Sequence, residues 1–270
     1  MERQMVFYGP VALGLLAACA AASPPASAPA TQPAVPPAVM EVLKDLESAG
    51  TKYDTIRANV DYQVTNPELG DSSQQTGWVA YQRAGVGEPN SPAKFRITFE
   101  TLKQGAGPAT KARTDWIFDG QWLAHLDHRT TTITEYQLAA KGQRVEPLRI
   151  GKGPFPLPFG QKVKDVLEHF TASTRPASPY DPKGTVYLRL VVRPEHAKSL
   201  NVTKLDLWMD KATRLPVKMR SWDANGYEKT VVLTNTQTNR PQDAAAFAIP
   251  RKEGWQRTVQ PLEQAGAAGP

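Results

Sequence analysis

The sequence is poor in cysteine: its 270 residues include only Cys19. A single cysteine forms no disulfide within the chain, and it excludes a metal site held by several cysteines. A globular domain of roughly 200–230 residues buries enough apolar surface to fold without such links. We therefore expect one domain with an ordinary apolar core, flanked by tails.

Sequence motifs for catalysis are also missing. The chain holds no nucleophile elbow and no HExxH motif, and Gly151-Lys152-Gly153 lacks the strand, helix and Lys-Ser/Thr ending of a phosphate loop. His125 and His128 fall where a predicted strand enters a turn, with no third ligand at a metal-binding spacing, and we expect both in a solvated turn. Asp206 and Asp210 lie on the wet side of another predicted strand. We predict no enzyme activity, no metal and no cofactor.

No block of basic residues stands out, although the formal net charge is +6. Lys and Arg are scattered beside Asp and Glu, unlike the basic stripe of a nucleic-acid-binding surface. Nucleic acid is therefore not a predicted partner. A modest positive charge does favour anionic lipid surfaces.

The apolar run near the start is too short for a permanent transmembrane helix. Met5–Ala22 is interrupted by Gly9-Pro10, and its strongly apolar part, Val11–Ala22, cannot span about 30 Å of hydrocarbon. A buried N-terminal helix fits poorly, because the proline interrupts it. A weakly charged start followed by such a run is typical of secretory signal peptides. We predict a signal peptide over residues 1–18.

Cys19 stands at the end of this run. Leu16-Ala17-Ala18-Cys19 resembles the bacterial lipobox, in which the cysteine is acylated and becomes the first mature residue. Residues 19–37, rich in Ala and Pro, would then form a solvated tether between lipid and domain. The alternative is cleavage at Ala18-Cys19-Ala20, giving a soluble periplasmic protein. We expect a membrane-anchored lipoprotein on the periplasmic side of a bacterial envelope.

Apolar periodicity predicts two helices and ten strands. Helical spacing covers Pro37–Ala49 and Gln161–Phe170, Glu146–Gly160 has the Pro and Gly content of a loop, and Asp119-Gly120 signals a hairpin turn. The segments with strand alternation are Ile56–Thr65, Thr76–Arg83, Lys94–Leu102, Thr114–Phe118, Gln121–Asp127, Thr131–Leu138, Thr185–Arg193, Thr203–Asp210, Leu215–Trp222 and Glu228–Asn235. This pattern predicts a mainly β (α+β) fold, a curved antiparallel sheet or partial barrel of about ten strands.

One face of this sheet is predicted to be apolar, because hydrophobic strand residues alternate with polar neighbours such as Arg96 and Lys218. The apolar set consists of Phe95, Ile97, Phe99, Trp116, Phe118, Leu205, Leu207, Met209, Val217 and Met219. These side chains either pack into an ordinary core or line a cavity, and the sequence leaves both open. The methionines suit a surface that adapts to flexible ligands, but methionine also fills gaps in cores.

Four stretches of the chain, in order, resemble the LolA/LolB-like lipoprotein carriers, the outer membrane lipoprotein-sorting proteins of the bacterial periplasm. They are a strand segment ending in arginine, a "DG-x-x-L/W…D" hairpin, a "D-x-x-T-x-x-P" strand pair and a closing "N…DAA-x-F-x-x-P". In this sequence these stretches are Gly77–Arg83, Phe118–Asp127, Leu207–Val217 and Asn239–Pro250. Together they cover about Val39–Trp255.

The resemblance implies an open β-barrel with a helical lid over a hydrophobic cavity that shelters acyl chains, lined here by the apolar set. The domain would span residues 38–256, followed by a disordered tail over 257–270. Arg83 matches the arginine that bonds to the lid and helps to hold it shut. The insertion Ala84–Pro92 departs from the family pattern, and so does a lipobox, which is closer to the membrane-anchored receptor type.

We therefore predict a non-enzymatic cell-envelope protein that binds lipid or lipoprotein acyl chains and acts as a chaperone in lipoprotein transport to the outer membrane. Expected partners are those acyl chains or lipids, the membrane through the N-terminal lipid anchor, and inner- or outer-membrane lipoprotein-transfer proteins. The alternative is an envelope sensor or interaction module that uses the same barrel to detect mislocalised lipoproteins.

Overall fold

The computed structural model describes residues 35–140, 142–143, 145, 148, 150 and 160–262. All of these residues belong to one compact unit. The predicted signal peptide, Cys19 and nearly all of the predicted tether lie outside the described residues. Within the described ranges, no helix is both long and apolar enough to cross a membrane.

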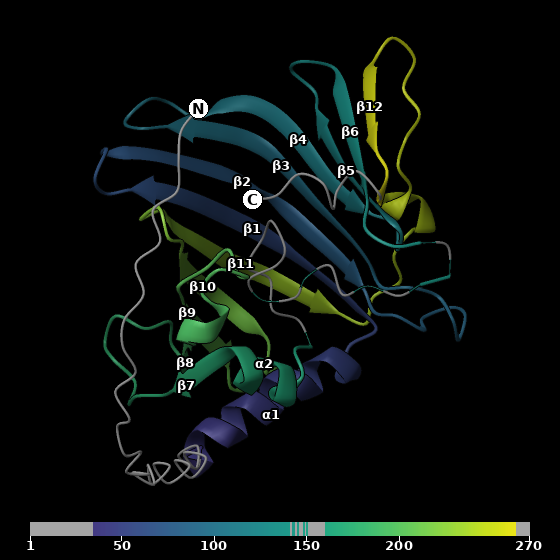
Figure 1. Cartoon of the computed structure of the whole chain (residues 1–270). Coiled ribbons are helices and arrows are strands. Elements are labelled where there is room, and N and C mark those ends of the chain that lie inside the picture. Colours follow the sequence, from purple (N-terminus) through teal and green to yellow (C-terminus); the bar gives the residue numbers. More distant parts are fainter. Residues whose placement is uncertain are drawn as a thin grey trace, which may run out of the picture. The chain divides into compact units, whose positions relative to one another are not determined.

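The described strands form one curved sheet in the order β12-β6-β5-β4-β3-β2-β1-β11-β10-β9-β8-β7 (Figure 1). The strands are β1 (Thr55–Asn66), β2 (Asp71–Gln82), β3 (Lys94–Gln104), β4 (Thr110–Phe118), β5 (Trp122–Asp127), β6 (Thr132–Gln137), β7 (Phe170–Ser173), β8 (Thr185–Val192), β9 (Lys204–Asp210), β10 (Pro216–Trp222), β11 (Glu228–Thr238) and β12 (Gln256–Gln260). All neighbours pair antiparallel except β12, which runs parallel to β6.

The predicted fold class is confirmed, with two additions to the sheet. All ten predicted strands are present, and the sheet stays open because β7 and β12 form its two edges. These two short strands were not predicted, so the sheet has 12 strands and not about ten. β12 also occupies part of the predicted disordered tail, while residues 263–270 lie outside the described ranges.

Two helices pack on one face of this sheet, which we call the inner face (Figure 1). α1 (Pro37–Lys52) begins with proline at its first turn, where a missing N–H costs nothing. Its buried side chains follow helical spacing and join the strand core; they are Val39, Val42, Leu43, Leu46 and Ala49. α2 (Val163–His169) is shorter than the predicted Gln161–Phe170 and buries Val166.

The two helices meet at a pair of glycines. A Cβ added to Gly50 of α1 would lie 2.2 Å from the Cα of Gly160, just before α2. Gly160 itself has φ +69°, in the left-handed region that favours glycine. Only glycine at both positions allows this approach, so α1 and the start of α2 form one packed unit.

The β4–β5 hairpin turns at Asp119-Gly120, as predicted. The Asp119 carboxylate accepts the backbone N–H groups of Gln121 and Trp122, at 2.9 and 2.8 Å. Gly120 has φ +113°, and a Cβ there would approach Cγ of Pro92 to 2.0 Å. Both the positive φ of Gly120 and its close approach to Pro92 therefore require glycine at this position of the turn.

The opposite, outer face is covered in part by the C-terminal segment. The 3-10 helix η2 (Ala244–Phe247) and the residues after it cross this face before β12 joins the sheet edge. Ile249 and Trp255 pack on a second apolar cluster, formed by Ile117, Ala124, Leu126 and Ile133. The sheet thus has apolar surface on both faces of β4–β6.

Candidate functional site

Nine of the ten predicted ligand-binding residues share the inner face. Eight are buried in the main core cluster with at most 2% of their surface exposed: Phe95, Ile97, Phe99, Phe118, Leu205, Leu207, Met209 and Met219. Trp116 is partly buried against the same cluster. The sequence pattern therefore identified the residues that the sheet brings together.

Val217 is the exception. The pairing of β9 and β10 shifts register between Pro216 and Lys218, so Val217 sits in a bulge. It is half-buried and is not part of the core cluster. A bulge inserts one residue and breaks the alternation on which the prediction depended.

Two titratable side chains of the inner face stack on residues of the predicted apolar set. Tyr62 stacks on Phe99 with ring centroids 5.8 Å apart, and burial together with the nearby Asp223 raises the pKa of Tyr62 to about 12. His125 stacks on Trp116 at 4.2 Å, and burial lowers its pKa in spite of Asp127. Both side chains therefore stay neutral near pH 7.

The chain covers this face with its own side chains. α1 packs on it from one side. Leu148 and Ile150 belong to the same cluster, and only 5% and 7% of their surfaces are exposed. Gln161 fixes both of these residues, since its side chain accepts the Ile150 N–H and donates to the Leu148 carbonyl, at 3.2 and 3.1 Å. The inner face is thus covered by α1 and by the side chains of Leu148 and Ile150.

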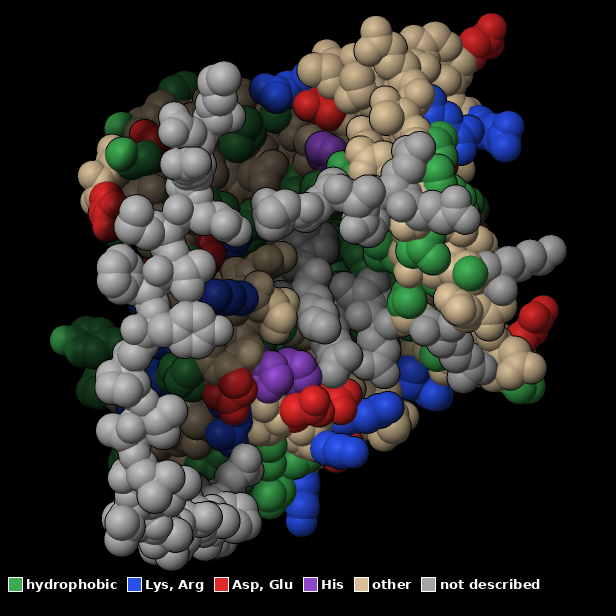
Figure 2. Space-filling view, in the orientation of Figure 1, with side chains coloured by type: hydrophobic (Ala, Val, Ile, Leu, Met, Phe, Trp, Pro, Cys, Tyr) green, Lys and Arg blue, Asp and Glu red, His purple; other side chains and the backbone are tan. Residues whose placement is uncertain are grey.

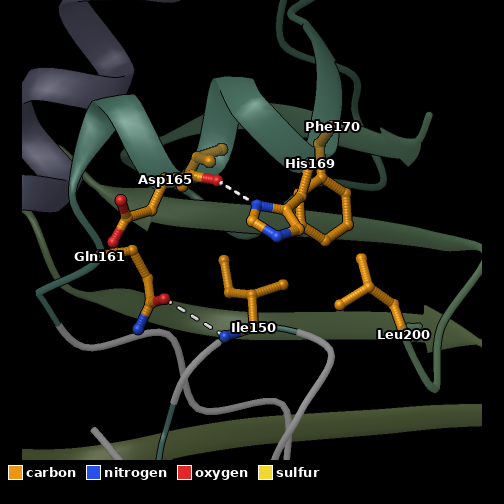
Figure 3. A pocket seen from close by; sticks show the side chains of 7 residues that line it. Ile150, Gln161, Asp165, His169, Phe170 and Leu200 are labelled. Atoms are coloured by element: carbon orange, nitrogen blue, oxygen red, sulfur yellow. Dashed lines mark hydrogen bonds between the residues drawn. The ribbon is translucent and has the colours of Figure 1, made fainter. Parts of the chain in front are cut away.

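A small pocket of about 10 Å³ remains beneath α2, large enough for about one water molecule (Figure 3). Its lining comprises Ile150, Gln161, Asp165, Val166, His169, Phe170 and Leu200. The His169 Nδ1 atom lies 2.9 Å from the Asp165 carbonyl oxygen, and its ring lies 4.6 Å from that of His196 in η1 (Pro194–His196). The packing beneath α2 is therefore nearly complete.

A larger, open pocket of about 500 Å³ lies where α1 ends and α2 begins. It contains apolar side chains, among them Tyr81, Ala93 and Leu148, and two basic residues, Arg83 and Lys162. Leu148 belongs both to this pocket and to the core cluster. The pocket therefore borders the apolar interior at the contact between the two helices.

Arg83 follows β2 at the edge of this pocket. Its Nη2 atom pairs with Oδ1 of Asp54, and its backbone N–H donates to the Asp54 carbonyl at 2.8 Å. Nη1 donates to the Ala84 carbonyl at 3.2 Å. Among the described residues, Arg83 is thus tied to Asp54, two residues after the end of α1, and not to a carbonyl within either helix.

A buried polar cluster around Asp115 lies on the outer face and was not predicted from the sequence. Asp115 of β4, 1% exposed, accepts from Thr98 Oγ1 at 2.6 Å and from Arg96 Nη2 at 3.0 Å, and its second oxygen lies 2.8 Å from His128 Nε2. Arg96 also donates to the Ala246 carbonyl of η2 at 3.1 Å. The cluster therefore ties the C-terminal segment to the sheet.

His128 belongs to this cluster and not to a solvated turn, since its ring also meets Trp255 edge-on at 5.0 Å. In the part of the chain that the structure describes, no group of three His, Cys, Asp or Glu residues could hold a metal ion. The face shown in Figure 2 carries basic and acidic side chains interspersed, without a block of one sign.

No protein-family model matches this sequence, and no curated protein sequence matches it. Solved structures similar to it include a Vibrio parahaemolyticus domain described as an outer membrane lipoprotein-sorting protein, at 12% identity and a TM-score of 0.37, covering 78% of this chain and 96% of that one. Lipoprotein LppX of Mycobacterium tuberculosis is 10% identical with a TM-score of 0.44, over 77% of this chain and 98% of LppX. LprF of Mycobacterium bovis is 12% identical with a TM-score of 0.42, over 81% of this chain and 99% of LprF.

Proposed function

We propose that this protein is a non-enzymatic envelope protein that binds acyl chains of lipids or lipoproteins on its inner face, in lipoprotein transport to the outer membrane. The observation that carries the proposal is the construction of that face. Nine large apolar side chains are covered by two helices and two aliphatic side chains, beside an open pocket. An acyl chain could replace this cover, because each CH₂ that leaves water stabilises the complex by about 0.8 kcal/mol.

The cover is suited to such an exchange. α1 is amphipathic, and its Asp45 pairs with Arg214 at the sheet rim. Just after the helix, Tyr53 Oη donates to the Thr213 carbonyl at 2.8 Å. Displacement of the joined helices would expose Phe99 and its neighbours to a ligand while leaving the strand ladder intact. The pocket at the helix contact is the proposed entrance.

Paired alanine substitutions on the two faces test this proposal. Phe99→Ala should weaken binding of a fluorescent fatty acid roughly tenfold, equivalent to about two methylene groups returned to water. Ile117→Ala, equally buried but on the outer face, should leave the affinity unchanged. Each variant should lose about 2–5 kcal/mol of stability, so circular dichroism must show that both remain folded.

Absence of fatty-acid binding by the wild-type protein would contradict the proposal. So would equal weakening by both substitutions, since the inner face would then have no special part in binding. A filled core with no ligand predicts one of these two outcomes.

Loss of the Arg83–Asp54 ion pair should loosen the end of α1. We propose that Arg83→Leu speeds transfer of a labelled lipoprotein to an acceptor membrane several-fold, and that Arg83→Lys restores it poorly because lysine lacks the planar fork. The pair is partly exposed, at 33% and 56%, so the stability change should stay below about 1 kcal/mol.

Arg220→Leu is the matched control for Arg83, because Arg220 forms a similarly exposed ion pair with Glu228 on the outer face. It should leave transfer unchanged. Equal transfer rates for the wild type and both Arg83 variants would contradict the proposal and would show that Arg83 is only a solvated surface side chain.

A further inference from the structure

The loop between β7 and β8 is held by one buried carboxylate. Asp181, whose side chain is 7% exposed, accepts two bonds from the Arg175 guanidinium at 2.7 and 2.8 Å. It also accepts from the Trp208 indole and from the Ser178 backbone N–H, both at 2.7 Å. Bidentate Arg–carboxylate pairs fix geometry as well as contributing energy. The loop is therefore rigid near its tip.

This rigid loop presents a tyrosine to solvent. Tyr180 is 93% exposed, more than any other large hydrophobic residue among those described. Its neighbours Pro179 and Lys183 are exposed as well. An exposed aromatic ring on a fixed loop contributes nothing to the core, and tyrosine is enriched among the residues that anchor contacts with another surface.

The charge that accompanies Tyr180 on the surface is positive. Lys183 and Lys211 are both exposed, and the Lys211 backbone N–H donates to the Gly184 carbonyl at 2.9 Å, which places the two turns together. The two acids of these turns accept hydrogen bonds from neighbouring protein groups. Asp181 accepts from Arg175, Trp208 and Ser178, and Asp210 accepts from the Thr213 N–H and hydroxyl at 2.8 and 2.9 Å.

We propose that the Tyr180 loop docks on an anionic lipid surface, with the tyrosine ring at the headgroup level and Lys183 and Lys211 near lipid phosphates. Tyrosine favours the membrane–water interface, and basic residues are attracted to anionic lipids. A protein partner fits less well, because a stable protein interface buries about 800 Å² on each side and this tip is only a few residues wide. The proposal does not depend on what the inner face binds.

Leu69 provides a matched comparison on the same molecule. It is 67% exposed at the tip of the β1–β2 hairpin, but it stands next to exposed Glu68 and close to exposed Asp71. The strand pairing places this hairpin at the strand ends opposite to the β7–β8 loop. An anionic surface should repel the Leu69 tip and attract the Tyr180 tip.

The test uses the full chain in a Cys19→Ser background, with Tyr180→Cys or Leu69→Cys labelled with an environment-sensitive fluorophore. Vesicles of phosphatidylcholine, with or without phosphatidylglycerol, are added at low and high salt. We expect a blue shift and brighter emission only for the label at position 180, only with phosphatidylglycerol, and less at high salt. Lys183→Gln and Lys211→Gln should each weaken the response roughly fivefold.

An equal response of the two labels would overturn the proposal, as would insensitivity to lipid charge or to both lysine substitutions. A response at position 180 to an acidic polypeptide, with none to vesicles, would assign the loop to a protein partner and would also overturn it. Lys229→Gln, whose side chain pairs with Asp223 away from this loop, is the control for net charge.

Discussion

Asp115→Ala is expected to lower the free energy of unfolding by about 3–5 kcal/mol, because it leaves the Arg96 charge buried without its partner. Arg96 is 16% exposed in its side chain, and His128 and Thr98 lose the same acceptor. Urea denaturation followed by tryptophan fluorescence measures the change. The C-terminal segment should also become easier to cleave, since Arg96 carries the bond to Ala246.

Asp127→Ala is the matched control for this substitution. Asp127 lies on the neighbouring strand, with a 17% exposed side chain and an ion pair of 3.7 Å to an exposed arginine. It should cost about 1 kcal/mol, mainly from the lost turn hydrogen bond. Similar losses for the two substitutions would show that the Asp115 cluster has no special stabilising role.

The pKa of Asp115 predicts how the free energy of unfolding depends on pH. Burial alone would raise the pKa of Asp115, but hydrogen bonds from Thr98, Arg96 and His128 outweigh it and lower the pKa to about 2. The folded-state pKa lies below the unfolded value of about 4. The stabilisation that ionised Asp115 provides is therefore complete above pH 4 and is lost as pH falls towards 2. The loss should be about 2 kcal/mol, and Asp115→Asn should lack this part of the acid dependence.

Cys19→Ala is expected to move the protein completely from the membrane fraction to the soluble periplasm. We propose that Cys19 is acylated at the lipobox-like Leu16–Cys19, which lies outside the described residues. Two or more acyl chains give stable membrane attachment, whereas the described helices include none that could span a bilayer. Fractionation of cells with labelled palmitate measures both localisation and acylation.

Ser23→Ala, four residues further along the predicted tether, should leave the protein in the membrane fraction and serves as the control. Wild-type protein that is wholly soluble and incorporates no palmitate would contradict the lipoprotein reading. The soluble periplasmic alternative would then stand, with cleavage near Cys19.

Much of the fold could be predicted from the sequence, because all ten predicted strands showed apolar alternation over at least part of their length and α1 showed helical apolar spacing. β12 could not, since Gln256–Gln260 is polar and its strand pairing comes from β6, far back in the chain. β7 follows α2 directly and has only four residues, too few for a pattern. The bulge at Val217 is a change of register, which alternation cannot reveal.

The Asp115 cluster escaped prediction for a related reason. An aspartate on the polar side of a strand is normally solvated, and the sequence around β4 gives no sign of a cover. That cover is supplied by η2 and Trp255, more than a hundred residues later in the chain. Arg83 was placed correctly at the end of its strand, but its partner Asp54 depends on how β1 and β2 meet the end of α1.

The pairing of β1 with β11 determines when this sheet can be completed. Among the described strands, the two halves of the sheet, β1–β6 with β12 and β7–β11, pair along this one seam, where Ile56 faces Thr238. The bond from the Asp54 N–H to the Asn239 side chain spans 185 residues. Contacts so distant in sequence form late and slowly, so a chain emerging from synthesis keeps the edge of β1 unpaired until β11 arrives. During that interval the apolar inner face depends on α1, its nearest neighbour in the chain, for shelter from aggregation.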